Sequence, residues 1–134
     1  MQKCVTAIIK NEKGEVLIQK HTKLQRYTLP GGKVENSEYE KFALIRECFE
    51  ELGVMVYRYE ELFTENYEDL EYPANSGNYF NFIQIFYEIT DYEGKIINKE
   101  PEKHPELLWV KPEKIRDLGP ISVVLNSYLE HIGL

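Results

Sequence analysis

Residues 31–54 read GGKVENSEYEKFALIRECFEELGV and join a diglycine loop to an amphipathic helix. The spacing predicts a helix over residues 37–52, because Ser37 followed by Glu40 forms a capping box. Gly53 supplies a typical C-terminal stop. At about 100° per residue, one apolar stripe of this helix contains Phe42, Ile45, Phe49 and Leu52.

The side of the helix opposite this stripe carries the carboxylates of Glu40, Glu47, Glu50 and Glu51. Like charges at such spacings repel by about 0.2–0.5 kcal/mol per pair, which matters little in solvent. Beside a partly buried loop the repulsion grows unless a cation offsets it. Carboxylate oxygens are ligands for Mg²⁺, Mn²⁺ and Ca²⁺, and a Gly-rich loop can approach a ligand closely. From the acidic residues alone, a metal site and a solvated acidic face both stay open.

Upstream of this stretch, the chain predicts two strands joined by a turn. Val5, Ala7 and Ile9 fall on one face of an alternating run. Residues 15–20 form a second run after the turn at residues 11–14, so we expect the pair to form a hairpin.

Downstream, strands are expected at residues 54–62, 79–88 and 107–110. Residues 63–78 are polar, rich in Tyr and contain Pro73 and Gly77, which predicts a loop. Residues 79–88 are apolar on both faces, as in a central strand, and their three Phe residues are expected in the core. These are Phe80, Phe82 and Phe86.

Two helices are expected near the end of the chain. Pro112 fits the first turn of a short helix. The buried face of a final helix is predicted to contain Ile121, Val124, Leu125, Tyr128, Leu129 and Ile132. The order strands, helix, strands, helix favours an α/β fold with helices packed on a mixed β-sheet.

Length and composition narrow the class of protein. With 134 residues, the chain is expected to form one domain spanning residues 1–134. A net charge of −7 disfavours binding to a nucleic acid polymer. Two cysteines cannot build a disulfide framework, and both are expected to be buried. The chain shows no signal peptide and no apolar run near the ~18 residues of a membrane span, so we expect a cytoplasmic protein without a membrane partner.

The spacing of glycines and charged residues in the opening stretch resembles the Nudix box. That box reads G, five residues, E, seven residues, R-E-apolar, any residue, E-E, any residue, G-apolar. The matching positions here are Gly32, Glu38, Arg46, Glu47, Glu50, Glu51, Gly53 and Val54. Cys48 stands where Ile, Leu or Val is usual, and Asn36-Ser37 replaces a common Gly. The box covers residues 32–54, and the elements around it also look like a minimal Nudix domain.

The resemblance implies an α/β/α sandwich with a mixed β-sheet between helices. It also implies hydrolysis of the diphosphate bridge of a nucleoside diphosphate derivative, with Mg²⁺ as the cofactor and Mn²⁺ as a substitute. It makes Glu47, Glu50 and Glu51 metal-binding carboxylates, one of which could serve as the base for the attacking water. The Gly31 carbonyl becomes a further ligand, and Arg46 would orient Glu47 through a charge-assisted hydrogen bond. Structural roles fall to Gly32, Glu38 and Gly53.

Other polar residues are candidates for completing this site. Arg26, Tyr27 and Lys33 flank the diglycine loop and are candidates for substrate binding, although solvated positions are an alternative. Gln84 interrupts an apolar strand, so it needs a partner and could contact a base edge. A downstream metal ligand or base is expected at Glu100 or Glu102. The histidines show no ligand spacing and are expected at the surface; they are His21, His104 and His131.

The box does not select the substrate. The short chain, with LPGGKVE at residues 29–35 and EPEKHPELLWV at residues 100–110, looks most like MutT-type nucleoside triphosphate pyrophosphatases. The expected products are a nucleoside monophosphate and pyrophosphate. Tyr72 keeps a dinucleoside polyphosphate substrate open, and a nucleotide sugar is a further alternative. Outside enzymes, a nucleotide-sensing domain remains open, as does a homodimer or partner surface at the Tyr-rich residues 57–79.

Overall fold

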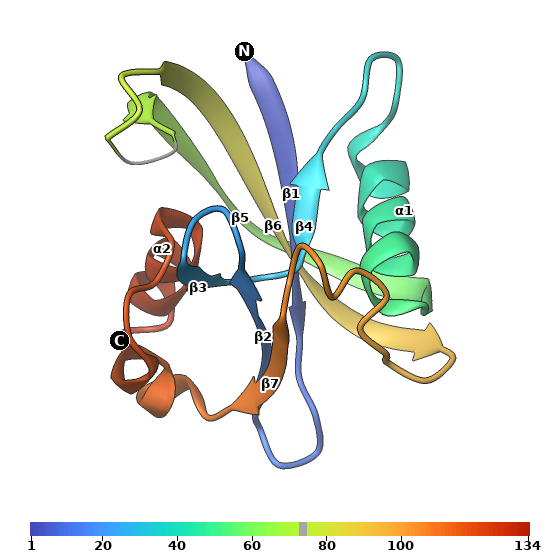
Figure 1. The fold of residues 1–134 in the computed structure, drawn as a ribbon. Helices are drawn as coiled ribbons and strands as arrows, with labels where there is room; N and C mark the ends of the chain where they lie inside the picture. The colour runs from blue at the N-terminus through green and yellow to red at the C-terminus, as the bar shows by residue number, and fades with distance from the viewer. Residues whose placement is uncertain (73–74) are drawn as a thin grey trace.

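The computed structural model describes residues 1–72 and 75–134; Pro73, which marked the expected loop, lies outside them. Figure 1 shows the two α-helices on opposite sides of the β-structure. The strands in the described residues are β1 Gln2–Ile9, β2 Val16–His21, β3 Arg26–Thr28, β4 Gly31–Lys33, β5 Met55–Glu71, β6 Tyr79–Glu93 and β7 Glu106–Val110. The helices are α1 Glu40–Leu52, the 3₁₀ helix η1 Pro112–Leu118 and α2 Val123–His131. The expected α/β fold is confirmed.

The strands divide into two sheets. The larger has the order β4-β1-β6-β5 and is mixed, because β1 and β6 run parallel while the other neighbours are antiparallel. The smaller is antiparallel with the order β3-β2-β7. The expected hairpin of the first two strands is therefore wrong. Strands β1 and β2 belong to different sheets and share only the isolated bridge between Lys10 and Val16.

Strand β1 lies in the middle of the larger sheet and is covered on both faces. Residues 4–9 are all buried, so its alternating pattern does not mark a solvent face. Strand β6 pairs with the whole length of β1 on one side and with β5 on the other, as expected of a central strand. Phe86 is buried as predicted, but Phe80 is 47% exposed, because β6 extends beyond the core there.

Strand β5 is longer than its sequence indicates. It continues to Glu71 and pairs with β6, so the predicted loop is wrong over residues 63–71. As the edge strand of the larger sheet, β5 can expose polar side chains while its backbone pairs with β6.

Helix α1 begins three residues later than predicted. Tyr39 is the N-cap and makes no side-chain cap, and Ser37 adopts a positive φ of 65°, so the expected capping box is wrong. The C-terminus behaves as predicted: Gly53 has a φ of 72°, and its N–H donates to the Phe49 carbonyl at 3.0 Å.

The buried face of α1 also differs from the predicted stripe. Phe42 and Phe49 are 52% and 49% exposed. The residues that pack inward on this helix are Ala43, Leu44, Cys48, Glu51 and Leu52. The small Ala43 and Cys48 belong, with Leu44 and Leu52, to the core cluster around β1. Glu51 also lies on this buried face.

Helix α2 packs on the other side of the sheets. Leu125, Tyr128 and Leu129 are buried as predicted, in a second core cluster with Ile8 and Phe86. Ile132 lies just after the helix and is 41% exposed, contrary to prediction. No helix in the described part of the chain has the length and apolar character needed to cross a membrane.

Candidate active site

The two glycines expected in a loop, Gly31 and Gly32, lie instead in strand β4, and they let this strand lie close to both β1 and α1. A Cβ atom on Gly31 would lie 2.1 Å from the Val5 carbonyl oxygen. A Cβ atom on Gly32 would lie 2.4 Å from the carboxyl carbon of Glu47. Glycine at both positions therefore allows the strand to insert and leaves room for the Glu47 carboxylate.

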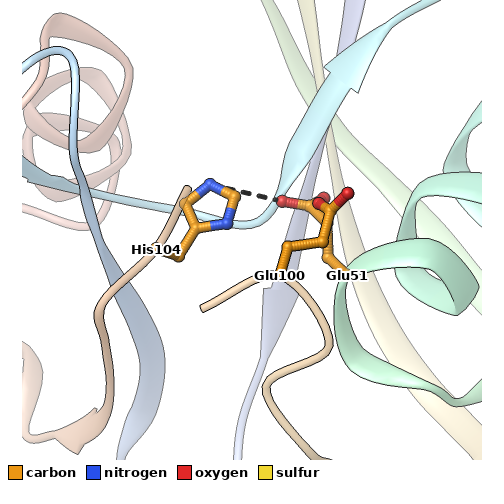
Figure 2. A group of neighbouring side chains, drawn as sticks. All are labelled: Glu51, Glu100 and His104. Atoms are coloured by element: carbon orange, nitrogen blue, oxygen red, sulfur yellow. Dashed lines mark ion pairs between the residues drawn. The ribbon is translucent and has the colours of Figure 1, made fainter. Parts of the chain in front are cut away.

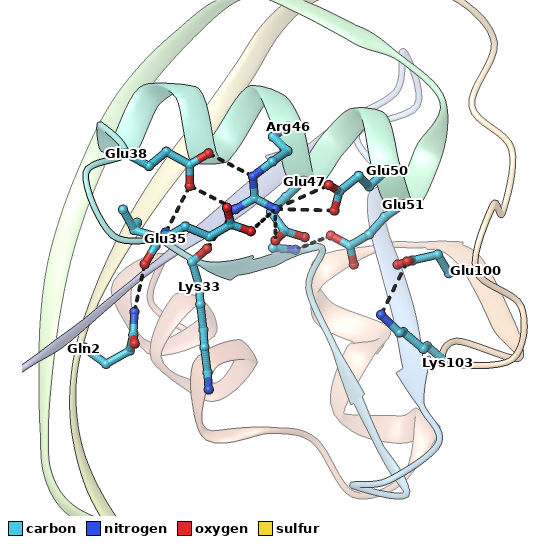
Figure 3. Close-up of polar contacts among 12 residues, drawn as sticks. Gln2, Lys33, Glu35, Glu38, Arg46, Glu47, Glu50, Glu51, Glu100 and Lys103 are labelled. Carbon is cyan, nitrogen blue, oxygen red and sulfur yellow. Dashed lines mark hydrogen bonds and ion pairs between the residues drawn. The ribbon is translucent and has the colours of Figure 1, made fainter.

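Arg46 links the loop to the start of α1 (Figure 3). Its Nε and Nη2 donate to the two carboxylate oxygens of Glu38 at 2.8 and 3.0 Å, and Nη2 also donates to the Lys33 carbonyl at 3.0 Å. This bidentate pair lowers the pKa of Glu38 to about 2, helped by the backbone N–H of Glu35. These contacts fit the structural role predicted for Glu38.

The other side of the Arg46 guanidinium faces two box glutamates. Nη1 donates to Glu47 Oε1 at 2.9 Å and lies 3.3 Å from Glu50 Oε2. Burial raises the pKa of Glu47, while the charge of Arg46 acts in the opposite direction. Glu50 is more open, with its side chain 47% exposed. The structure thus contains the Arg46–Glu47 hydrogen bond that the sequence predicted.

Glu51 is 3% exposed, yet both its oxygens have partners. Gln19 Nε2 donates to Oε1 at 3.2 Å, and the Gly31 N–H donates to Oε2 at 3.0 Å. Burial and the nearby Glu47 carboxylate raise the pKa of Glu51 to about 8. A buried carboxylate of this kind is a candidate ligand for a cation.

The loop after β6 places two further side chains beside Glu51. Its backbone docks on the end of α1, because the N–H groups of Ile97 and Lys99 donate to Leu52 and Glu51 carbonyls, each at 3.0 Å. The His104 N–H then donates to the Glu100 carbonyl at 2.9 Å. Figure 2 shows the resulting group of Glu51, Glu100 and His104, whose ligand atoms lie within 4.8 Å of one another.

His104 corrects one sequence expectation, since it is buried at 6% exposure. Its Nε2 lies 3.7 Å from Glu51 Oε1, and its Nδ1 is buried without a hydrogen-bond partner. Burial, with smaller contributions from His21 and Lys103, lowers the pKa of His104 to about 4. The available sequence signal was its spacing of four from Glu100, which forms a single turn in the structure.

A cavity of 1190 Å³ connects this group with several predicted residues. Arg26, Lys33 and Gln84 line it, together with the two loop glycines and Glu47. Its lining also includes the aromatic residues Tyr67, Tyr72, Phe80 and Phe82. Gln84 also has the partner that it needed, because its Nε2 donates to Thr6 Oγ1 at 2.5 Å.

Several candidates, among them Tyr27, Glu50 and Glu102, lie outside the cavity lining. Tyr27 packs against the second core cluster, and Glu50 contacts Arg46. Glu102 is exposed, whereas Glu100 joins the group around Glu51. Of the two downstream acids that the sequence left open, the geometry thus favours Glu100.

The group Glu51, Glu100 and His104 fits a divalent cation chemically. It offers two carboxylates and one imidazole on a cavity wall, next to the buried and unpartnered Oε1 atom of Gln19. Metal binding would also relieve the cost of burying the Glu51 charge.

Comparisons with known proteins agree with this architecture. The model of the NUDIX domain family matches residues 1–128. An 8-oxo-dGTP diphosphatase of Haemophilus influenzae is 31% identical over 110 residues, which cover 78% of this chain and 71% of that protein. A MutT NUDIX hydrolase of Burkholderia pseudomallei superposes with a TM-score of 0.82 at 25% identity, covering 98% and 97% of the two chains. A MutT protein of Methanosarcina mazei Go1 gives 0.76 at 26% identity, covering 96% and 90%.

Proposed function

Since this chain belongs to the NUDIX family and is a pyrophosphohydrolase, we propose that it hydrolyses nucleoside triphosphates, including modified ones, to the monophosphate and pyrophosphate. The observation that carries the proposal is the buried Glu51 carboxylate beside Glu100, on the wall of a cavity that also contains basic and aromatic side chains. The similarity to an 8-oxo-dGTP diphosphatase supports a triphosphate substrate. We further propose that residues 1–134 form one catalytic domain.

We propose Mg²⁺ as the cofactor, with Mn²⁺ as a substitute. Glu51 and Glu100 would hold the ion, and Glu47, Glu50 and the Gly31 carbonyl are further proposed ligands. A bound divalent ion neutralises charge on phosphate oxygens and lowers the pKa of water. Such a site allows a protein with a net charge of −7 to bind a polyphosphate.

The chain's own residues are proposed to position the reaction. Arg46 holds Glu47 and Glu50 in place through its Nη1 contacts. Glu47 lines the cavity beside Gly32 and is our candidate for the base that accepts a proton from the attacking water. Lys33 and Arg26 supply positive charge on the cavity wall, where they can contact phosphate groups.

The aromatic residues that line the cavity favour one alternative substrate. Tyr72, Phe80 and Phe82 provide flat apolar surfaces for stacking a base. Because Tyr72 lines the cavity, a dinucleoside polyphosphate is the second candidate. Nucleotide sugars, a nucleotide-sensing role without turnover and a homodimer through residues 57–79 stay as weaker alternatives.

A nucleotide panel tests the proposal. The purified chain is incubated with Mg²⁺ and canonical triphosphates, 8-oxo-dGTP, diadenosine tetraphosphate or ADP-ribose, and the products are separated by ion-exchange chromatography. We expect pyrophosphate and a nucleoside monophosphate in equal amounts from a triphosphate. Turnover of diadenosine tetraphosphate alone would favour the alternative. A melting shift without any product would favour the sensing role and contradict the proposal.

A further inference from the structure

The imidazole of His104 is buried, yet it makes no hydrogen bond that would explain a structural role. The side chain is 6% exposed, and its Nδ1 has no partner. Its Nε2 faces Glu51 Oε1 at 3.7 Å, which is beyond hydrogen-bond length. Native proteins rarely leave a buried polar group unpaired without a functional reason.

The backbone around His104 is built to hold the imidazole in this place. The Glu100–His104 turn is closed by the His104 N–H, and Asn98 Nδ2 donates to the His104 carbonyl at 2.6 Å. On the outer side of the loop, the Thr22 N–H donates to the Lys103 carbonyl at 2.8 Å. The ring of His21 packs edge-on against the ring of His104, with centroids 5.4 Å apart. The imidazole is therefore fixed toward Glu51 and Glu100, as Figure 2 shows.

We propose that His104 is a nitrogen ligand that completes a mixed nitrogen and oxygen site with Glu51 and Glu100, and that its imidazole strengthens the binding of Mn²⁺, the substitute cofactor, more than the binding of Mg²⁺. The inference rests on the proposed function for the assignment of Glu51 and Glu100 as metal ligands. Imidazole suits transition ions, whereas Mg²⁺ prefers oxygen ligands and retains several waters. His104 lies outside the Nudix box, so the motif itself does not include this ligand.

Pulsed electron paramagnetic resonance of Mn²⁺ bound to the nucleotide-free chain tests the inference. A directly bound histidine produces a nitrogen modulation of the manganese signal. We expect this modulation in the unaltered chain, and we expect ¹⁵N-labelled histidine to change it. His104→Gln should abolish it, whereas His131→Gln, on an exposed ring stacked against Phe63, should retain it. Absence of the modulation from the unaltered chain, or its loss in His21→Gln with retention in His104→Gln, would overturn the inference.

Calorimetric titration with each metal gives the second measurement. His104→Gln should weaken Mn²⁺ binding by about tenfold and Mg²⁺ binding by less than about threefold. Equal losses for both ions would contradict selective ligation. Hydrolysis of a triphosphate with Mg²⁺ is measured in parallel. Hydrolysis without nitrogen modulation refutes only this inference, whereas modulation without hydrolysis refutes only the proposed function.

Discussion

The buried carboxylate of Glu51 is unfavourable for stability when charged, yet the proposed metal site depends on its charge. Its carboxylate is 3% exposed and accepts hydrogen bonds from Gln19 and the Gly31 backbone. Burying an ionised carboxylate is costly unless a cation or several donors compensate. Without metal, Glu51 therefore lowers the free energy of unfolding at alkaline pH, where its carboxyl group is charged.

Glu51→Gln is expected to stabilise the metal-free chain at pH 8.5. The neutral amide removes the buried charge, and the unpartnered Oε1 of Gln19 can accept from the new amide after rotation of the Gln19 side chain. We expect a rise in Tm of several degrees without metal. We also expect millimolar Mn²⁺ to raise the Tm of the unaltered chain but not that of Glu51→Gln. Differential scanning calorimetry measures both. Glu60→Gln, on the exposed edge strand, is the control. An unchanged metal response in Glu51→Gln would contradict the assignment.

The two loop glycines are expected to respond differently to substitution by Ala. In Gly31→Ala the new Cβ meets the Val5 backbone, so Tm should fall markedly. In Gly32→Ala its nearest neighbours are the atoms of the Glu47 carboxylate, the movable end of a side chain, so Tm should change little. The displaced Glu47 should lower kcat/KM for pyrophosphate release by about 100-fold. Thermal melts and steady-state kinetics on both variants check this, and full activity in Gly32→Ala would show that the position of Glu47 is unimportant.

At the level of elements, the existence of α1 could be predicted but its orientation could not. The helical spacing and the Gly53 stop were local signals, and the structure has a helix that ends at Gly53, although the predicted apolar stripe is not its buried face. The buried face depends on what the helix packs against, and small Ala43 and Cys48 permit close packing in the core around β1. Hydrophobicity alone selected Phe42 and Phe49, which are exposed. The start of the helix was also mispredicted, because Ser37 adopts a positive φ of 65° and does not cap the helix.

A pair of truncations tests the orientation of α1. Leu44→Ala is expected to lower the free energy of unfolding by about 2–5 kcal/mol, because Leu44 is fully buried. Phe42→Ala should change it by less than about 1 kcal/mol, because that ring is 52% exposed. Urea denaturation measures both values. The reverse order would support the stripe predicted from sequence and contradict the structure.

The Glu38–Arg46 pair links the loop to α1 and should make stability sensitive to acid. The ordinary carboxyl pKa of 4.5 applies to the unfolded chain, while the folded value is about 2. The pair therefore contributes its full stabilisation above pH 4.5, and this contribution is lost as the pH falls toward 2. Glu38→Gln should remove this part of the pH dependence, whereas Glu60→Gln should not. Urea midpoints between pH 2 and 6 provide the test, and identical curves for Glu38→Gln and the unaltered chain would contradict it.

At the scale of the whole molecule, part of the site is assembled by contacts between segments distant in sequence. Local sequence patterns do not reveal which residues these contacts bring together. The loop that contains Glu100 reaches Glu51 through backbone hydrogen bonds to the end of α1, between segments about a third of the chain apart in sequence. The sequence could therefore name Glu100 and Glu102 as alternatives without separating them. The packing of this loop against α1 also buries His104, a residue that belongs to no recognisable sequence motif. The box residues were identifiable because their spacing lies within one loop and one helix.

The central claim is that Glu51 and Glu100 together hold the divalent ion used in hydrolysis. Its most direct test is the rate of pyrophosphate release from a triphosphate substrate at increasing Mn²⁺ or Mg²⁺ concentration, for Glu100→Gln beside Glu102→Gln. The two acids lie two residues apart in one loop, but only Glu100 faces Glu51. We predict that Glu100→Gln loses at least about tenfold in rate and needs more metal for half-maximal activity, while Glu102→Gln matches the unaltered chain. Equal rates and metal requirements in all three proteins would contradict the claim.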